Sequence, residues 1–151
     1  MATQNNNQKS AFEILSGKKI LWVEDDPFLS SIIAKKFSGL NCILLCASNG
    51  QEALRLAEEE TPDIVMLDIL LSGMDGFEIL SRIKEHPKGA LIPVVVLTTS
   101  KHQKEINKAY ELGASSFVTK SENFSELAAK LNSVNHYWLK TVEMPALGDE
   151  K

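Results

Sequence analysis

The chain has 151 residues, 44% of them hydrophobic, which is enough apolar side-chain volume for one core but not for two. Its 16 Lys and Arg against 20 Asp and Glu give a net charge of -4, so the chain offers no electrostatic basis for direct nucleic-acid binding. No apolar run approaches the roughly 18 to 20 residues of a membrane span, and the polar start lacks a signal-peptide pattern. We therefore expect one cytoplasmic domain without membrane contact.

This domain is expected to span residues 18–135, between a polar leader (1–17) and a C-terminal helix extension and tail (136–151). Short apolar runs alternate with longer amphipathic runs, which predicts five βα units around a parallel sheet. The strands are predicted at 19–24, 43–47, 64–68, 94–98 and 116–119. The first, third and fourth are continuously apolar, so helices should cover both faces of the sheet. The expected fold is a doubly wound, flavodoxin-like α/β sheet of five strands in the order 2-1-3-4-5, with five helices.

The helices are predicted from apolar stripes between the strands and from their end signals. The first should begin at Asp26 and Pro27, an N-cap followed by a proline in the first turn, and this accounts for Asp26 without a metal-binding role. The fourth should end just before Gly113. Asn123 and Glu126 have capping-box spacing and mark the start of the fifth helix.

The apolar stripe of the fifth helix continues to Trp138, which allows the helix to run past Tyr137. Together with Leu139 and Val142, these side chains form more apolar surface than a small domain needs. They either fold back onto the domain or form the seam of a homodimer. The end of the chain, from about Pro145, is expected to be disordered.

The cysteines and histidines do not form a recognisable site. Cys42 and Cys46 fall in one predicted strand, where four residues separate their Cα atoms by about 13 Å, too far for a disulfide. His86, His102 and His136 are scattered through separate segments, with no pair at zinc-ligand spacing. We expect reduced cysteines and no transition-metal site.

Polar side chains stand at the carboxyl ends of the predicted strands. Glu24 and Asp25 close the first strand, Asp68 closes the third, Thr98 closes the fourth, and Lys120 follows the fifth. In an open doubly wound sheet, ligands bind at this edge, where the strand order switches. Crowded carboxylates repel one another, and a hard divalent cation such as Mg²⁺ relieves that repulsion best. The sequence therefore predicts a Mg²⁺ site equipped for phosphoryl transfer, which needs charge neutralisation and an in-line nucleophile.

Four segments, ILWVEDDP, IVMLDILLSGMDGFEIL, VVVLTTS and FVTK, resemble the signature blocks of response-regulator receiver domains of two-component systems. They occur in the family's order over roughly residues 18–135, and four blocks in register are far more specific than one motif. The resemblance implies that Asp68 is the phosphoacceptor and that Lys120 and Thr98 contact the phosphoryl group.

The same resemblance implies further roles. Mg²⁺ would be held by Glu24, Asp25, Asp68 and the backbone carbonyl of Leu70, and Thr98 would act with Phe117 as a conformational switch. The implied protein is a single-domain signalling switch and not an enzyme in the usual sense. Its implied partners are a histidine kinase or phosphotransfer protein and a separate downstream protein. The end HYWLKTVEMP also resembles phytochrome-associated single-domain regulators, which slightly favours a homodimer.

Some residues depart from the family pattern. Ser72 and Ser121 stand where the family usually has prolines. Without the proline at position 72, the loop after the third strand should be less rigid. Without the proline at position 121, a trans bond is expected after Lys120, which should shift the loop that carries this lysine. Thr99 is bulkier than the usual residue. Leu70 and Ser100 offer no acid or amide to orient an attacking water, which predicts slow self-dephosphorylation.

The sequence leaves two other functions to weigh against this one. The departures at Ser72 and Ser121 suit a degenerate receiver that acts as a constitutive binding or dimerisation module, although the intact acidic, threonine and lysine positions speak against it. A metal-dependent phosphatase on a similar sheet would need a second acid near the nucleophile, where this chain has Leu70.

Overall fold

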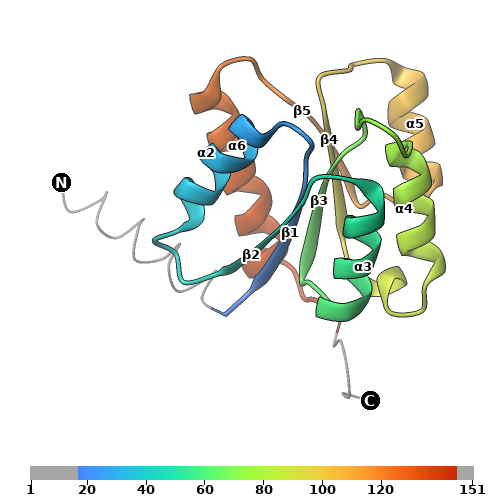
Figure 1. Cartoon of the computed structure of the whole chain (residues 1–151), viewed down its shortest axis with the longest axis horizontal. Coiled ribbons are helices and arrows are strands. Elements are labelled where there is room, and N and C mark those ends of the chain that lie inside the picture. The colour runs from blue at the N-terminus through green and yellow to red at the C-terminus, as the bar shows by residue number, and fades with distance from the viewer. Residues whose placement is uncertain (1–16, 146–151) are drawn as a thin grey trace.

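A computed structural model describes residues 17–145, which form a five-stranded parallel sheet between two layers of helices (Figure 1). The strands are β1 (Lys19–Val23), β2 (Ile43–Ala47), β3 (Ile64–Asp68), β4 (Val94–Thr98) and β5 (Ser116–Thr119). The helices are α2 (Pro27–Phe37), α3 (Gly50–Glu60), α4 (Gly76–Glu85), α5 (Gln103–Glu111) and α6 (Phe124–His136), with the short elements η1 (Gly89–Leu91) and η2 (Tyr137–Thr141). The predicted leader, up to residue 16, and the tail after residue 145 lie outside the described residues.

The strand order is β2-β1-β3-β4-β5, as predicted, and all pairs of neighbouring strands are parallel. Every residue of β3 and β4 is buried, because helices cover both faces of these central strands. Helices α2 and α6 lie on one face, and α3, α4 and α5 lie on the other (Figure 1). The fold is therefore the predicted doubly wound arrangement.

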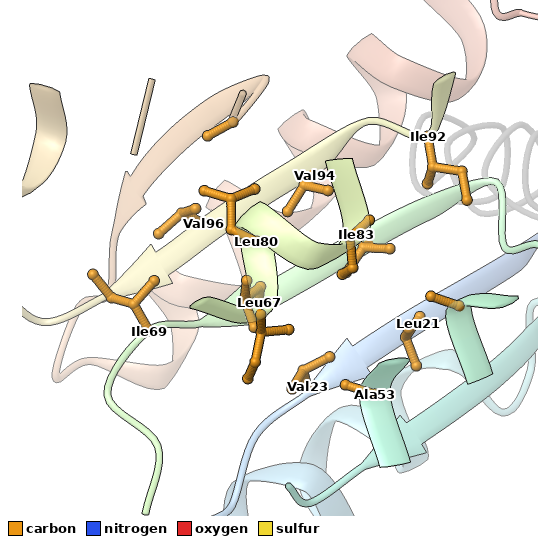
Figure 2. Packing of buried hydrophobic residues seen from close by; sticks show 14 of the residues in the cluster. Leu21, Val23, Ala53, Leu67, Ile69, Leu80, Ile83, Ile92, Val94 and Val96 are labelled. Atoms are coloured by element: carbon orange, nitrogen blue, oxygen red, sulfur yellow. The ribbon is translucent and has the colours of Figure 1, made fainter. Parts of the chain in front are cut away.

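Alternate residues of the strands build two separate core layers. The layer beneath α3, α4 and α5 includes Leu21, Leu67 and Val96, which pack against Leu80 and Ile83 of α4 (Figure 2). The opposite layer, beneath α2 and α6, contains Trp22 and Met66 of the sheet together with residues of both helices. Both layers end at the carboxyl edge of the sheet, where the polar residues begin.

The helix starts agree with the sequence signals, with one difference. Asp26 caps α2 through a 3.0 Å hydrogen bond that its carboxylate accepts from the Phe28 N–H. Asn123 caps α6 in the same manner, but Glu126 does not complete the capping box by accepting from the Asn123 N–H. The carboxylate of Glu126 instead accepts the hydroxyl of Ser121, which in turn accepts the Asn123 N–H at 3.2 Å. The serine hydroxyl therefore connects the two halves of the box.

The C-terminal extension continues α6 as one π-helical turn, η2, so the helical path passes Tyr137 as expected. Trp138 and Leu139 are half-buried and pack against the core layer beneath α2 and α6. These two residues thus fold back onto the domain, whereas Tyr137 remains 50% exposed and meets the Trp138 ring edge-on at 5.2 Å between centroids. Homodimer formation stays a prediction.

Cys42 and Cys46 are free thiols, as expected. Among residues 17–145, no helix has the length and apolar character of a membrane span.

Candidate functional site

Strands β1 and β3 are neighbours, and their register sets the geometry of the site. Val23 pairs with Leu67, so the residues that follow them, Glu24 and Asp68, lie side by side at the carboxyl ends of β1 and β3. Both residues are only 5% exposed. Two acidic side chains are therefore held close together at a nearly dry sheet edge, as the sequence predicted.

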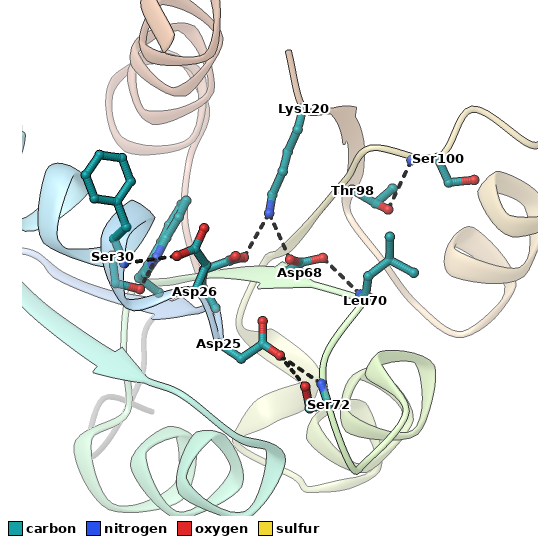
Figure 3. Close-up of polar contacts among 12 residues, drawn as sticks. Asp25, Asp26, Ser30, Asp68, Leu70, Ser72, Thr98, Ser100 and Lys120 are labelled. Atoms are coloured by element: carbon teal, nitrogen blue, oxygen red, sulfur yellow. Dashed lines mark hydrogen bonds and ion pairs between the residues drawn. The ribbon is translucent and has the colours of Figure 1, made fainter. Parts of the chain in front are cut away.

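Lys120 lies between these two carboxylates. Its ammonium group donates to Glu24 Oε2 and to Asp68 Oδ2, at 2.8 Å in each case (Figure 3). Its backbone N–H donates to the Thr98 carbonyl at 2.7 Å, which ties the loop after β5 to the end of β4. Burial opposes the charge of Lys120, but the hydrogen bonds to Asp68 and Glu24 outweigh it and raise the pKa of Lys120.

Glu24 has the most unusual acid–base property of the site. Burial, followed by the adjoining Asp68 carboxylate, raises the pKa of Glu24 to about 7, although Lys120 acts in the opposite direction. Near neutral pH, this group is therefore divided between its protonated and ionised forms. The single ammonium of Lys120 does not offset the electrostatic cost of keeping two carboxylates ionised at one buried point.

Asp25, the residue after Glu24, forms its side-chain hydrogen bonds with Ser72, in the loop between β3 and α4. Its Oδ2 accepts the Ser72 backbone N–H at 2.9 Å and the Ser72 hydroxyl at 2.8 Å (Figure 3). These hydrogen bonds, the backbone one foremost, lower the pKa of Asp25, so this carboxylate is ionised at neutral pH. Asp25 thus contributes a permanent negative charge beside Glu24.

Asp68 is fixed through both oxygens. Its Oδ2 accepts from Lys120, and its Oδ1 accepts the Leu70 N–H at 2.9 Å, an Asx turn that folds the chain back at the strand end. One oxygen each of Glu24, Asp25 and Asp68 can be chosen so that all three lie within 4.8 Å of one another. Three carboxylate oxygens at this spacing are suitable ligands for a hard divalent cation, and one ammonium alone leaves negative charge uncompensated.

Thr98 is the last residue of β4, the strand next to Asp68, and Phe117 lies one strand further away on β5. Thr98 is fully buried, and its hydroxyl accepts the Ser100 N–H at 3.2 Å. Phe117 is half-buried against the core layer beneath α3, α4 and α5, and its N–H donates to the Tyr110 hydroxyl at 3.2 Å. Their role as a conformational switch stays a prediction.

The structure brings together Lys120 and the predicted site residues at the ends of β1, β3 and β4. Phe117 lies one strand further along the sheet, opposite Val96 of β4. No peptide bond in the described part of the chain is cis, as expected for Ser121, yet Lys120 still reaches both Glu24 and Asp68. A shift of the loop that carries Lys120 stays a prediction. Ser72 binds Asp25 through two hydrogen bonds, and the lower rigidity expected of its loop stays a prediction. A serine in this loop could have been recognised as a donor pair, because its N–H and hydroxyl can serve one carboxylate together.

The fold agrees with comparisons to known proteins. The family model of the response regulator receiver domain matches residues 20–132, so this chain belongs to that family. A similar relative is the response regulator Rcp1 of Synechocystis, which is 33% identical over 138 residues, covering 85% of this chain and 94% of Rcp1.

Two crystal structures extend the likeness. The Mn²⁺-bound form of response regulator Rcp1 has a TM-score of 0.75 at 35% identity and covers 85% of this chain and 99% of its own. The phosphorylated cyanobacterial phytochrome response regulator RcpA has a TM-score of 0.78 at 33% identity, covering 87% of this chain and 100% of its own. The five-stranded receiver fold is therefore shared along most of each chain.

Proposed function

We propose that this protein is a phosphorylation-dependent signalling switch, in which Asp68 accepts a phosphoryl group from a histidine kinase or a phosphotransfer protein. One observation carries the proposal: Asp68 stands at the sheet edge with a neighbouring acidic pair and receives a hydrogen bond from the Lys120 ammonium. Membership of the receiver family and the likeness to the phosphorylated RcpA structure support it.

Asp68, Lys120 and Thr98 each have a proposed role in the phosphoryl transfer. A carboxylate oxygen of Asp68 forms the new P–O bond while the P–N bond of the donor phosphohistidine breaks, and the imidazole leaves with the electron pair. Lys120 is placed to donate to a phosphoryl oxygen on Asp68, because its ammonium already touches that carboxylate. Thr98, at the end of the adjacent strand, supplies a hydroxyl that can donate to a second oxygen.

The acidic cluster is the proposed Mg²⁺ site. Glu24, Asp25 and Asp68, with the backbone carbonyl of Leu70, would supply oxygen ligands, and the spacing of the three carboxylates fits such an ion. When bound, Mg²⁺ offsets the negative charge that gathers on the transferring phosphoryl group. The Mn²⁺-bound structure of Rcp1 supports a divalent cation in this family.

The output of the switch is proposed to be protein binding. A phosphoryl group adds between one and two negative charges, and Thr98 and Phe117 would reorganise in response, which alters the β4–β5 side of the domain. A separate protein in the cytoplasm would recognise this altered side. The protein consumes no substrate of its own, and homodimer formation through the C-terminal segment is part of the proposal.

The test is incubation with Mg²⁺ and a small phosphodonor such as acetyl phosphate, followed by intact-mass measurement. The wild type is expected to gain the mass of one phosphoryl group, and Asp68→Asn is expected to gain none. Asp75→Asn serves as the control, because Asp75 caps α4 outside the cluster and asparagine caps equally well. The control should be modified like the wild type.

Unmodified wild type under these conditions, with its fold intact, would overturn the proposal and favour a constitutive binding module. Modification of Asp68→Asn at the wild-type level would place the acceptor elsewhere.

A further inference from the structure

The contact between Asp25 and Ser72 joins two loops at the cation site. Asp25 follows β1, and Ser72 lies in the loop between β3 and α4, 47 residues further along the chain. Two donors of one residue, the backbone N–H at 2.9 Å and the hydroxyl at 2.8 Å, converge on one oxygen atom of Asp25. Such convergence fixes the carboxylate in direction as well as in place.

Asp25 needs a fixing contact of this kind. It is less buried than Glu24 and Asp68, which are packed at the strand ends, so its side chain would otherwise be free to sample several rotamers. Both Ser72 bonds reach Oδ2, and in Figure 3 the other oxygen of Asp25 is turned away from Ser72, to the side where Asp68 and Lys120 lie. The serine thus occupies one oxygen and leaves the second directed into the acidic cluster.

The same contact sets the position of the loop itself. Gly73, the next residue, has a φ of +87°, a left-handed conformation that turns the chain immediately after Ser72. Leu70 lies two residues before Ser72 and is fixed at its N–H by Asp68. The segment from Asp68 to Ser72 is therefore held at both ends, by Asp68 on one side and by Asp25 on the other.

We propose that Ser72 is a positioning residue for the divalent-cation site, acting through Asp25 and through the loop that carries Leu70. The proposal rests on the proposed function, since it presumes that the acidic cluster binds a cation. Residues that hold a metal-binding carboxylate by hydrogen bonds commonly change metal affinity by about tenfold or more when they are replaced. A proline at this position would lack the N–H donor as well as the hydroxyl.

The experiment measures Mn²⁺ binding to the full chain without phosphodonor, with the free ion followed by electron paramagnetic resonance. Ser72→Ala removes the hydroxyl and keeps the N–H, and we expect its dissociation constant to rise about tenfold. Ser72→Thr keeps the hydroxyl and should restore binding to within about threefold of wild type. Ser81→Ala is the matched control, because the Ser81 hydroxyl also donates to a carboxylate, that of Glu85, on the exposed side of α4.

Melting in the presence of chelator provides a second measurement. Ser72→Ala should melt like the wild type in chelator, so that the loss is confined to the cation-bound protein. If wild type binds Mn²⁺ and Ser72→Ala binds within threefold of it, the positioning role is overturned and the proposed function is untouched. If wild type binds no Mn²⁺, the cation part of the proposed function falls together with this inference.

Discussion

The pKa of Glu24 predicts how cation affinity depends on pH. Burial and the Asp68 carboxylate raise this pKa to about 7, whereas the pKa of Asp25 is lowered, so Asp25 is ionised throughout the neutral range. A divalent cation requires the ionised form of its carboxylate ligands, so its binding competes with the proton on Glu24. Affinity for Mg²⁺ should therefore rise with pH through 7 and level off above 8.

The size of the effect follows from the fraction of Glu24 that is ionised before binding. With a pKa of about 7, that fraction is about one tenth at pH 6 and about nine tenths at pH 8. The dissociation constant for Mg²⁺ should thus be about tenfold larger at pH 6 than at pH 8. At pH 7, binding should release about half a proton, because about half of the Glu24 side chains are still protonated.

Isothermal titration calorimetry can measure both quantities. Titrations at pH 6, 7 and 8 give the affinities, and two buffers of different ionisation enthalpy at pH 7 give the released proton. Glu24→Gln provides the control: its affinity should be lower throughout but nearly independent of pH over this range. A wild-type change of less than twofold between pH 6 and pH 8, or an equally steep change in Glu24→Gln, would refute the reasoning.

Three further substitutions, one of them with a matched control, test the packing of the fold. Asn135 is 3% exposed, and neither of its amide atoms has a hydrogen-bond partner within residues 17–145. Because an unpartnered buried amide costs free energy, Asn135→Leu should raise the free energy of unfolding by about 1 to 2 kcal/mol, measured by urea denaturation. A Cβ on Gly76 would collide with the backbone of Ile69, so Gly76→Ala should lower the free energy of unfolding by about 1 to 3 kcal/mol. Gly39→Ala is the control: a Cβ there meets nothing, so stability should change by less than about 0.5 kcal/mol. Trp138→Ala should cost about 2 kcal/mol, and a loss that depends on protein concentration would contradict the fold-back and favour a dimer seam.

Most of the fold could be predicted because its signals are local and strong. The runs IVMLD and VVVLT are apolar throughout, and they form the two fully buried strands. Asp26 followed by Pro27 fixed the start of α2 equally well. The π-helical turn at Tyr137–Thr141 was beyond such reasoning, because an apolar stripe does not distinguish the hydrogen-bond spacing of a π-turn from that of an α-helix.

The sequence predicts which residues meet at the acidic cluster, but not all of the contacts between them. The strand order alone brings Glu24, Asp68 and Lys120 to one edge. The contact between Ser72 and Asp25 was not predicted, because a comparison with proline addresses backbone stiffness and not the two donors that serine offers. The raised pKa of Glu24 depends on its burial in the folded chain, which no motif encodes.

The hydrogen bond of the Thr98 side chain has a consequence for the connection between β4 and α5. Its oxygen now holds the amide of Ser100, in the connection that leads from β4 to α5. If the side chain rotates toward a modified Asp68, that amide must find another acceptor or water, and the first residues of the connection are released from their present turn. A change at Asp68 would then reach the start of α5 through the main chain of this connection.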